Sequence, residues 1–482
     1  MSNISELILA NSRRFPETIA LETPRGELSY GALARQAQQA RAALAARGCE
    51  PGAVVGFATR DAQLTIVTVL GAWLLGASAM ILDFRKPVFE RKAAADRFGC
   101  ALFLEDSVVT DAGCPVLSVA DWSAEIAAED PEEAPVAGDT HPALIALSSG
   151  TAGTPAAVAL SHATQIARFS RWSPEFLAEI QRRYLSTEPM AFAGSIGRVF
   201  NGLLCGGTSI LFPTFFRPAD LFDVLETKQV TGCALVPTVL RDLLRYSRES
   251  GRTLRHLTHR LWLITHGAPI QARELDEILE RLSPNLLQIY GGLTPGHLAL
   301  LDVARERHKI DTVGRPYSGI TIEIVDEEDR PLPTETIGRL RIYASGIGTP
   351  LGREEEFKDG WYYPGDLGSY DADGYLKLMG REGDVIVRGG SVVYLQDVEA
   401  VLSGVAGIHQ VAAVGLADER YGQDLVLGVV SDLDAAAIGR IFRDRASPSH
   451  RPSRIVVVSS LPQNANGKID KRAMASMLSE AR

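Results

Sequence analysis

Along the first three quarters of the chain, short apolar runs alternate with longer stretches in which apolar residues recur at helical spacing. A short apolar run between turn residues is typical of a buried strand, and apolar positions three and four residues apart are typical of a helix. Strands that alternate with helices predict βα units, with largely parallel sheets covered by helices on both faces. The predicted strands are residues 54–59, 78–84, 208–213, 233–237 and 261–267, and the clearest predicted helices are residues 32–48 and 218–229.

The pattern changes in the last third of the chain. From Thr321, short strands flank turns, which predicts a small β-subdomain, and a compact α+β pattern begins near Gly383. We therefore predict an α/β fold with a large N-terminal domain, residues 1–381, and a small mobile α+β C-terminal domain, residues 382–482. The acidic, proline-containing segment Glu125–Asp139 lacks periodicity and is predicted to be a surface connector.

Length, charge and cysteine content narrow the class of protein. The chain has 482 residues and a formal net charge of −10. It exceeds the ~250–300 residues that one hydrophobic core usually supports, and its acidity argues against a nucleic-acid-binding protein. Five scattered cysteines without metal-binding spacing are typical of reduced thiols in a cytoplasmic protein. The first residues form a predicted amphipathic helix rather than a signal peptide, and the apolar stretch Leu64–Leu82 contains threonine, serine and glycine, so we expect no membrane span.

The loop after one apolar run is rich in serine, threonine and glycine: LSSGTAGTPAAV, residues 147–158. Glycines allow backbone N–H groups to converge on one point, and hydroxyl groups add donors, so such a loop can surround a phosphate chain. It is not a Walker P-loop, which needs a lysine after its last glycine. Taken alone, the loop is equally well an ordinary serine- and glycine-rich turn.

Further motifs follow at QIYGGLTPG (288–296), GWYYPGDLG (360–368), GREGDVIVRGG (380–390) and LPQNANGKIDKR (461–472). Weaker ones are LSYGAL (28–33), GAWLLGASAMILDF (71–84) and HRPSRIVVVSSLP (450–462). Their order and spacing resemble the adenylate-forming superfamily, over nearly the whole chain. That superfamily contains acyl-CoA and aryl-CoA synthetases, the adenylation domains of nonribosomal peptide synthetases, and firefly luciferase.

The resemblance implies an ATP-dependent acid–thiol ligase. In such enzymes a carboxylate attacks the α-phosphorus of ATP, pyrophosphate leaves, and the acyl-AMP then passes its acyl group to CoA. The implied cofactors are ATP, Mg²⁺ and CoA, and the implied partner is a small carboxylic acid. The C-terminal domain is expected to rotate about Gly383 between the two half-reactions, because glycine tolerates large backbone changes.

The resemblance also assigns residues of this chain to each task. Lys468 is expected to contact the α-phosphate and the carboxylate, and Thr294 is a second catalytic candidate and a weak Mg²⁺ ligand that acts through the ATP phosphates. Asp366 is expected to accept hydrogen bonds from both ribose hydroxyls, and Arg381 is the second ribose contact. The other implied ATP-binding residues are Ser148, Ser149, Gly150, Thr151, Gly153, Ala268, Tyr290 and Gly291. The implied acyl pocket is Ala193, His266, Gly267 and Gly292, and the implied CoA tunnel is Arg388, Gly389 and Gly390.

Three positions depart from the family's pattern. Ala156 stands where the phosphate loop usually has a lysine, and Pro364 replaces a threonine. The motif Y-G-x-T-E appears as YGGLTP, residues 290–295, without the glutamate that would hold Mg²⁺. These losses favour a non-catalytic relative that binds nucleotide or an acyl ligand, whereas the retained Asp366, Arg381 and Lys468 favour an enzyme.

Further residues indicate which class of acid is activated and which thiol accepts the acyl group. Ala193 occupies the position where amino-acid adenylation domains have an aspartate for the substrate's amino group, so we predict a non-amino acyl or aryl acid. His266 replaces a glycine, and it either shortens the pocket, hydrogen-bonds a polar substrate or packs facing away. The segment Arg388–Gly390 resembles that of CoA synthetases. It favours CoA, while a stand-alone enzyme that loads an acyl carrier protein remains the nearest alternative.

Overall fold

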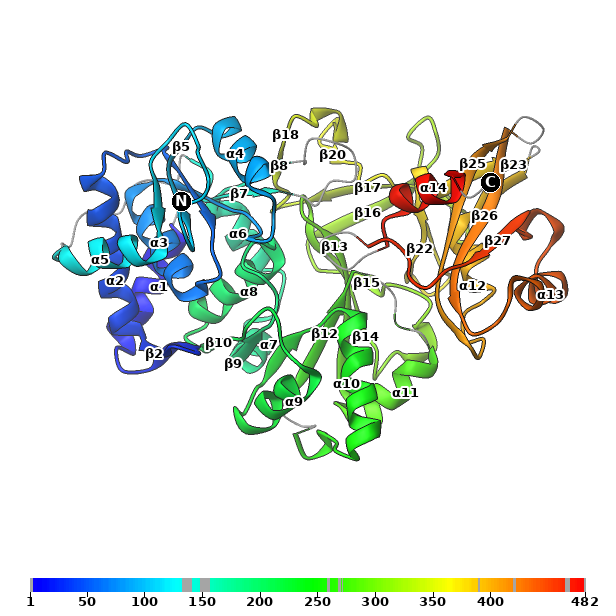
Figure 1. The fold of residues 1–482 in the computed structure, drawn as a ribbon, viewed down its shortest axis with the longest axis horizontal. Coiled ribbons are helices and arrows are strands. Elements are labelled where there is room, and N and C mark those ends of the chain that lie inside the picture. The colour runs from blue at the N-terminus through cyan, green and yellow to red at the C-terminus, as the bar shows by residue number, and fades with distance from the viewer. Residues whose placement is uncertain are drawn as a thin grey trace.

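The computed structural model describes residues 3–131, 141–147, 157–257, 261–267, 270, 272–388, 391–418, 422–463 and 469–480. The architecture is α/β, as predicted. Two large sheets with parallel centres come first along the chain, followed by a small sheet and by a separate C-terminal sheet (Figure 1).

The first large sheet has seven strands in the order β18-β8-β7-β4-β3-β5-β6. The strands from β7 to β6 are parallel to their neighbours, whereas β8 and β18 are antiparallel additions at one edge. In the same order the strands are Thr349–Leu351, Ala157–Leu160, Leu144–Leu147, Ser78–Ile81, Val54–Ala58, Cys100–Glu105 and Val116–Ser118. The predicted apolar runs 54–59 and 78–84 therefore form central strands.

Helix α3 (Ala62–Leu75) accounts for most of the longest apolar stretch in the sequence. Its residues from Leu64 to Leu74 are all buried, so the helix is apolar all round because protein surrounds it. It packs against α2 (Tyr30–Ala46) at Gly71, where a Cβ atom would lie only 2.8 Å from the Ala37 carbonyl oxygen. No helix in the described ranges is long and apolar enough to cross a bilayer.

The second large sheet has nine strands in the order β15-β14-β13-β12-β11-β9-β10-β1-β2. Its neighbours from β13 to β1 are parallel, so their carboxyl ends meet at one edge of the sheet. In the same order the strands are Arg315–Pro316, Gly296–Asp302, Asn285–Gly292, Trp262–His266, Gly232–Ala234, Arg183–Ser186, Thr208–Leu211, Ile19–Thr23 and Gly26–Ser29. The helices between them are α7 (Pro174–Ile180), α8 (Ala193–Leu204), α9 (Pro218–Thr227), α10 (Pro237–Ser250) and α11 (Ala272–Arg281).

The predicted connector Glu125–Asp139 is wrong in its first part. Helix α5 (Val119–Ala128) continues through it, because Ile126 is buried in the core and Glu125 forms an ion pair with Arg47. Residues 132–140 lie outside the described part of the chain. The remaining helices of this half are α1 (Ile4–Arg14), α4 (Val88–Arg97) and α6 (His162–Phe169).

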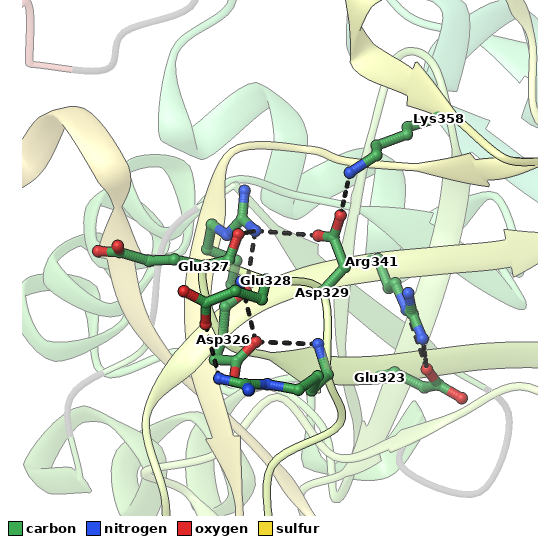
Figure 2. A network of polar contacts seen from close by, with 9 residues as sticks. Glu323, Asp326, Glu327, Glu328, Asp329, Arg341 and Lys358 are labelled. Carbon is green, nitrogen blue, oxygen red and sulfur yellow. Dashed lines mark hydrogen bonds and ion pairs between the residues drawn. The ribbon is translucent and has the colours of Figure 1, made fainter.

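The small third sheet has the order β19-β20-β17-β21-β22, with β16 beside β17. Its strands are Phe357–Lys358, Trp361–Tyr362, Gly338–Ala344, Asp366–Tyr370, Leu376–Arg381 and, for β16, Ile320–Val325. The turn between β16 and β17 carries a network of charged side chains (Figure 2). In it Arg330 contacts Asp326, and Asp329 contacts both Arg339 and Lys358.

The last sheet is built only from residues that follow Asp384. Its order is β24-β23-β26-β25, and β27 lies beside β26. These strands are Ser391–Tyr394, Val385–Arg388, Gly422–Ser431, Ile408–Asp418 and Arg454–Val457, and the helices are α12 (Leu395–Ala400), α13 (Ala435–Arg445) and α14 (Lys471–Glu480). The sheet has a hydrophobic core of its own, centred on residues such as Val393, Leu427 and Phe442. In Figure 1 this unit carries the orange and red end of the chain.

Candidate active site

The serine- and glycine-rich loop connects two adjacent antiparallel strands. Strand β7 ends at Leu147 and β8 begins at Ala157, and these two residues pair with each other. The predicted phosphate-binding residues Ser148, Ser149, Gly150, Thr151 and Gly153 lie outside the described part of the chain, as do Ala156, Ala268, Gly389, Gly390 and Lys468. The structure therefore locates the two ends of the loop, and the role of the loop stays a prediction.

The two predicted ribose contacts meet across one pair of antiparallel strands. Asp366 begins β21, Arg381 ends β22, and the two residues are direct cross-strand partners. The Arg381 Nε atom lies 3.1 Å from the Asp366 Oδ1 atom. The hydroxyl of Tyr290, from β13, donates a hydrogen bond to Asp366 Oδ2. Burial and the charge of Asp366 raise the pKa of Tyr290 well above its usual value, so the phenol remains a neutral donor.

The YGGLTP motif forms a tight turn between β13 and β14, and we call Leu293–Pro295 the β13–β14 turn. Gly291 and Gly292 are paired with His297 and Gly296 at the base of the turn. A Cβ atom at Gly291 would lie 2.2 Å from the Gly296 carbonyl oxygen, so only glycine fits there. Thr294 is buried, and its carbonyl oxygen accepts a hydrogen bond from the Gly348 N–H group at 2.7 Å.

Two arginines hold this turn, and no sequence motif predicted them: Arg168 in the last turn of α6 and Arg171 just after the helix. Arg168 donates hydrogen bonds to three carbonyl oxygens: those of Leu293 at 3.0 Å, Thr294 at 2.6 Å and Gly346 at 2.9 Å. Arg171 donates to those of Pro295 at 2.9 Å, His297 at 2.6 Å and Ser345 at 2.6 Å. We call Arg168 and Arg171 the arginine clamp. Their sequence context does not distinguish them, because basic residues are common in and after the last turn of a helix.

Beside the predicted acyl pocket lies a mostly buried carboxylate, Glu188, that no sequence motif predicted. Glu188 follows β9 and forms an ion pair with Arg198, which projects from α8. Its other oxygen lies 3.2 Å from the Nε2 atom of His266, at the end of β12. The parallel order of β12, β11 and β9 brings these carboxyl ends to one edge, so residues far apart in the sequence meet. Ala193, the first residue of α8, lies between Glu188 and Arg198 in the chain.

Electrostatics keep Glu188 ionised inside the protein. Burial raises the pKa of Glu188, but the charge of Arg198 and the contact with His266 outweigh burial and lower the pKa to about 2. Nearby His297 is held neutral, because burial and the surrounding arginines lower its pKa well below the usual value. Among the predicted pocket residues, Gly267 has a φ of +88°, and Gly292 lies exposed beside the β13–β14 turn.

A cavity of about 350 Å³ lies beside Glu188. It opens where the carboxyl ends of β3, β4 and β5 from the first sheet face those of β9 and β10 from the second. Its walls include Glu188, Met190, Arg60 and Phe84. Crevices at the carboxyl ends of parallel strands are the usual ligand sites of α/β folds, so this edge has room for a substrate.

The residues predicted for the hinge and the CoA tunnel lie at the start of the last sheet. Gly383 is in a short 3₁₀ turn, Glu382–Asp384, directly after β22. Asp384 contacts Lys471, the first residue of α14, at 3.6 Å, and Lys471 also contacts Glu399 at 3.1 Å. Arg388 forms an ion pair with Asp424 at 3.1 Å and remains inside its own unit.

The described residues offer no cluster of three or more histidine, cysteine, aspartate or glutamate side chains that could hold a metal ion. The β13–β14 turn contains Thr294, which is buried, and no acidic residue.

Comparisons with known proteins agree with the geometry. The model of the AMP-binding enzyme family matches residues 9–349, and that of the AMP-binding enzyme C-terminal domain matches residues 397–468. The indoleacetate–CoA ligase of Aromatoleum aromaticum is 28% identical over 97% of this chain and 96% of its own length. The fatty acid–[acyl-carrier-protein] ligase ScoC of Streptomyces coeruleorubidus is 27% identical over 95% of this chain and 93% of its own. Among solved structures, ATP-bound MatB from Rhodopseudomonas palustris has a TM-score of 0.89 at 21% identity, over 98% of both chains.

Proposed function

Since the chain belongs to the AMP-binding enzyme family of the adenylate-forming superfamily, we propose that it is an AMP-forming acid–thiol ligase for a non-amino carboxylic acid. In the first half-reaction, a carboxylate oxygen attacks the α-phosphorus of ATP, the bond to the bridging oxygen breaks, and pyrophosphate leaves. In the second, a thiol sulfur attacks the acyl carbonyl carbon, AMP leaves, and the thiol proton passes to solvent.

The observation that carries this proposal is the cluster of Asp366, Arg381 and Tyr290. A carboxylate fixed by a phenol and a guanidinium group presents an ordered acceptor for a diol, which is the chemistry that a ribose requires. Three segments separated by up to ninety residues supply it, so an accidental surface pair is a poor explanation. The ATP-binding roles of Gly291 and of residues 148–153 follow from the same family pattern.

The charges beside the acyl pocket support a non-amino substrate. Glu188 is a buried carboxylate, but Arg198 already neutralises it, and both side chains are mostly buried. A substrate ammonium group would add an unpaired positive charge beside Arg198 and His266, which is unfavourable in a buried site. An acyl or aryl acid without an amino group avoids that repulsion. The proposed pocket consists of Ala193, His266, Gly267 and Gly292.

We propose CoA as the thiol, in agreement with the Arg388–Gly390 segment. The similarity to the acyl-carrier-protein ligase ScoC supports a carrier-protein phosphopantetheine as the alternative acceptor. For either thiol, we propose that the unit after residue 381 rotates about Gly383, removes Lys468 from the reaction centre and brings in residues 388–390. The separate sheet and separate core of that unit support this domain boundary.

Mg²⁺ would shield the phosphates, and the donors at the β13–β14 turn imply that ATP oxygens and water hold it, with Thr294 as a weak contact. The cysteines Cys49, Cys100, Cys114, Cys205 and Cys233 are all free thiols, which supports a reducing compartment. We therefore propose the cytoplasm as the location of the enzyme.

Pyrophosphate release across a panel of aliphatic, aryl and amino acids tests the proposed function. We expect release with at least one non-amino acid, none with α-amino acids, and a thioester when CoA is added. Asp366→Asn should raise the KM for ATP, whereas Asp373→Asn, at an exposed position on the same sheet, should not. Nucleotide binding without pyrophosphate release for any acid would instead favour the non-catalytic relative. A thioester with carrier protein but not with CoA would favour the alternative acceptor.

A further inference from the structure

The arginine clamp is a pair of cations whose charge no described acidic side chain balances. Hydrogen bonds from both arginines go to carbonyl oxygens, and no carboxylate in the described ranges forms an ion pair with either one. The Nε atom of Arg171 is buried and has no hydrogen-bond partner. Burying two neighbouring like charges is unfavourable, so a folded protein that keeps them needs a compensating gain.

The backbone around the clamp is shaped to admit the two guanidinium groups. Gly296 has a φ of +70°, and a Cβ atom there would lie 2.8 Å from Arg168 Nε and 3.1 Å from Arg171 Nη1. Gly346 has a φ of +83°, and its Cβ would lie 3.2 Å from Arg171 Nη2. Glycine is therefore required on both sides of the clamp, for conformation and for space.

The clamp is connected to two segments that this superfamily uses for metal and phosphate. One is the β13–β14 turn, which lacks the metal-binding glutamate. The other is β8, which begins where the phosphate loop ends and pairs with β18. Gly348, next to β18, donates to the Thr294 carbonyl and packs beside Val158 of β8. The clamp therefore holds the β13–β14 turn directly, and it follows β8 in the chain by way of α6.

We infer that Arg168 and Arg171 are positioning residues whose positive charge favours the ATP phosphates, in place of the lysine absent at Ala156 and of the metal held by a glutamate. They act through the β13–β14 turn, which they fix with hydrogen bonds, and through their uncompensated field in a poorly solvated region. Burial and mutual repulsion lower the pKa of Arg168 to about 9, and burial lowers that of Arg171 to about 10, so both remain cations near pH 7. This inference rests on the proposed function, because it assumes that ATP is the ligand.

The test compares the binding of adenosine, AMP and ATP, each measured calorimetrically with and without Mg²⁺. In Arg168→Gln and Arg171→Gln, we expect adenosine affinity to change less than about twofold and ATP affinity to fall about tenfold or more, with AMP in between. Arg171→Lys, which keeps the charge but not the fork, should retain most of the ATP preference. Arg330→Gln, in the turn drawn in Figure 2, is the matched control and should not change the affinity for any of the three ligands.

Two results would overturn the inference. One is an equal loss for all three ligands in the glutamine variants, with lysine no better than glutamine, because that pattern describes a purely structural clamp. The other is an ATP-to-adenosine affinity ratio that is the same in Arg168→Gln, Arg171→Gln and wild type, when thermal unfolding shows that the variants fold. If wild type binds none of the three ligands, the proposed function fails instead, so the two failures are distinguishable.

Discussion

The arginines of the β16–β17 turn and those of the arginine clamp differ in their partners. In the turn, Arg330 lies 2.8 Å from Asp326, and Arg339 lies 2.9 Å from Asp329 (Figure 2). In the clamp, both arginines meet only carbonyl oxygens in the described structure. Arg330 is 71% exposed, and it could lose its partner at little cost because water screens its charge. The clamp has no such screening, and this difference indicates that its charge is kept for a ligand.

Arg198 shows how a counter-charge within the protein can stabilise a buried arginine. Arg198 is buried, as Arg171 is, but Glu188 neutralises it. Burial lowers the pKa of Arg198, yet Tyr184 and Glu188 raise it more strongly, and the net change is upward. The pKa values of the clamp residues move downward instead. Burial alone therefore does not set the pKa of these arginines; the groups that surround each guanidinium also contribute.

The largest effect is expected at Lys468, which we propose contacts the α-phosphate. Lys468→Ala should slow acyl-adenylate formation by ~10²–10³-fold, because a preorganised charge on the α-phosphate is lost. Thioester formation from supplied acyl-AMP should remain largely intact. Rapid-quench measurement of each half-reaction decides this, with the exposed Lys377→Ala as the control. Equal losses in both half-reactions would contradict the proposed role.

Removing the counter-charge of Arg198 tests the paired site. Glu188→Gln should lower the free energy of unfolding by about 3–5 kcal/mol near pH 7, since Arg198 is left buried and unpaired. The folded pKa of Glu188, about 2, lies below the ordinary value of 4.5, so its stabilisation is present above pH 4.5 and disappears as the pH falls toward 2. Denaturation curves at several pH values should show the deficit of the variant shrinking over that range. A constant deficit would mean that packing, not charge, stabilises the site.

A lysine introduced into the phosphate loop tests whether the clamp supplies the positive charge that the family's loop lysine provides. As a single substitution, Ala156→Lys should lower the KM for ATP about threefold. A solvent-accessible ionic contact contributes ~0.5–1 kcal/mol, which corresponds to a change of this size. In an Arg171→Gln background the gain should be larger, because the clamp no longer supplies part of the charge. Steady-state kinetics over an ATP titration measures both. Identical gains in the two backgrounds would show that the loop and the clamp act independently.

The smallest effect is expected in the solvent-facing network. Arg330→Gln should change the free energy of unfolding by less than about 0.5 kcal/mol, because Arg330 is 71% exposed and its ion pairs are screened. Urea denaturation at low and high salt checks this. A loss above about 1 kcal/mol would remove the contrast between the two regions.

Local pattern was enough for much of the fold. The apolar runs at 54–59 and 208–213 became central strands β3 and β10, and the long apolar stretch became the buried helix α3. The order of the motifs was enough for the superfamily, and the spacing of Asp366 and Arg381 agrees with their pairing across β21 and β22. The connector at Glu125 failed because one buried residue, Ile126, extended a helix that polar composition argued against.

What only the tertiary structure decided is which charges meet. Arg168 reaches the carbonyl oxygen of Thr294 across 126 residues of sequence, and Glu188 meets His266 because β9 and β12 lie in one parallel sheet. Periodicity describes residues a few positions apart, and motifs describe a family's conserved segments. Strand order and packing determine which distant residues meet. An arginine at one position is a solvated surface charge, and an arginine at another is a cation without a counter-charge. The fold makes this distinction, because it determines the burial and the partners of each side chain.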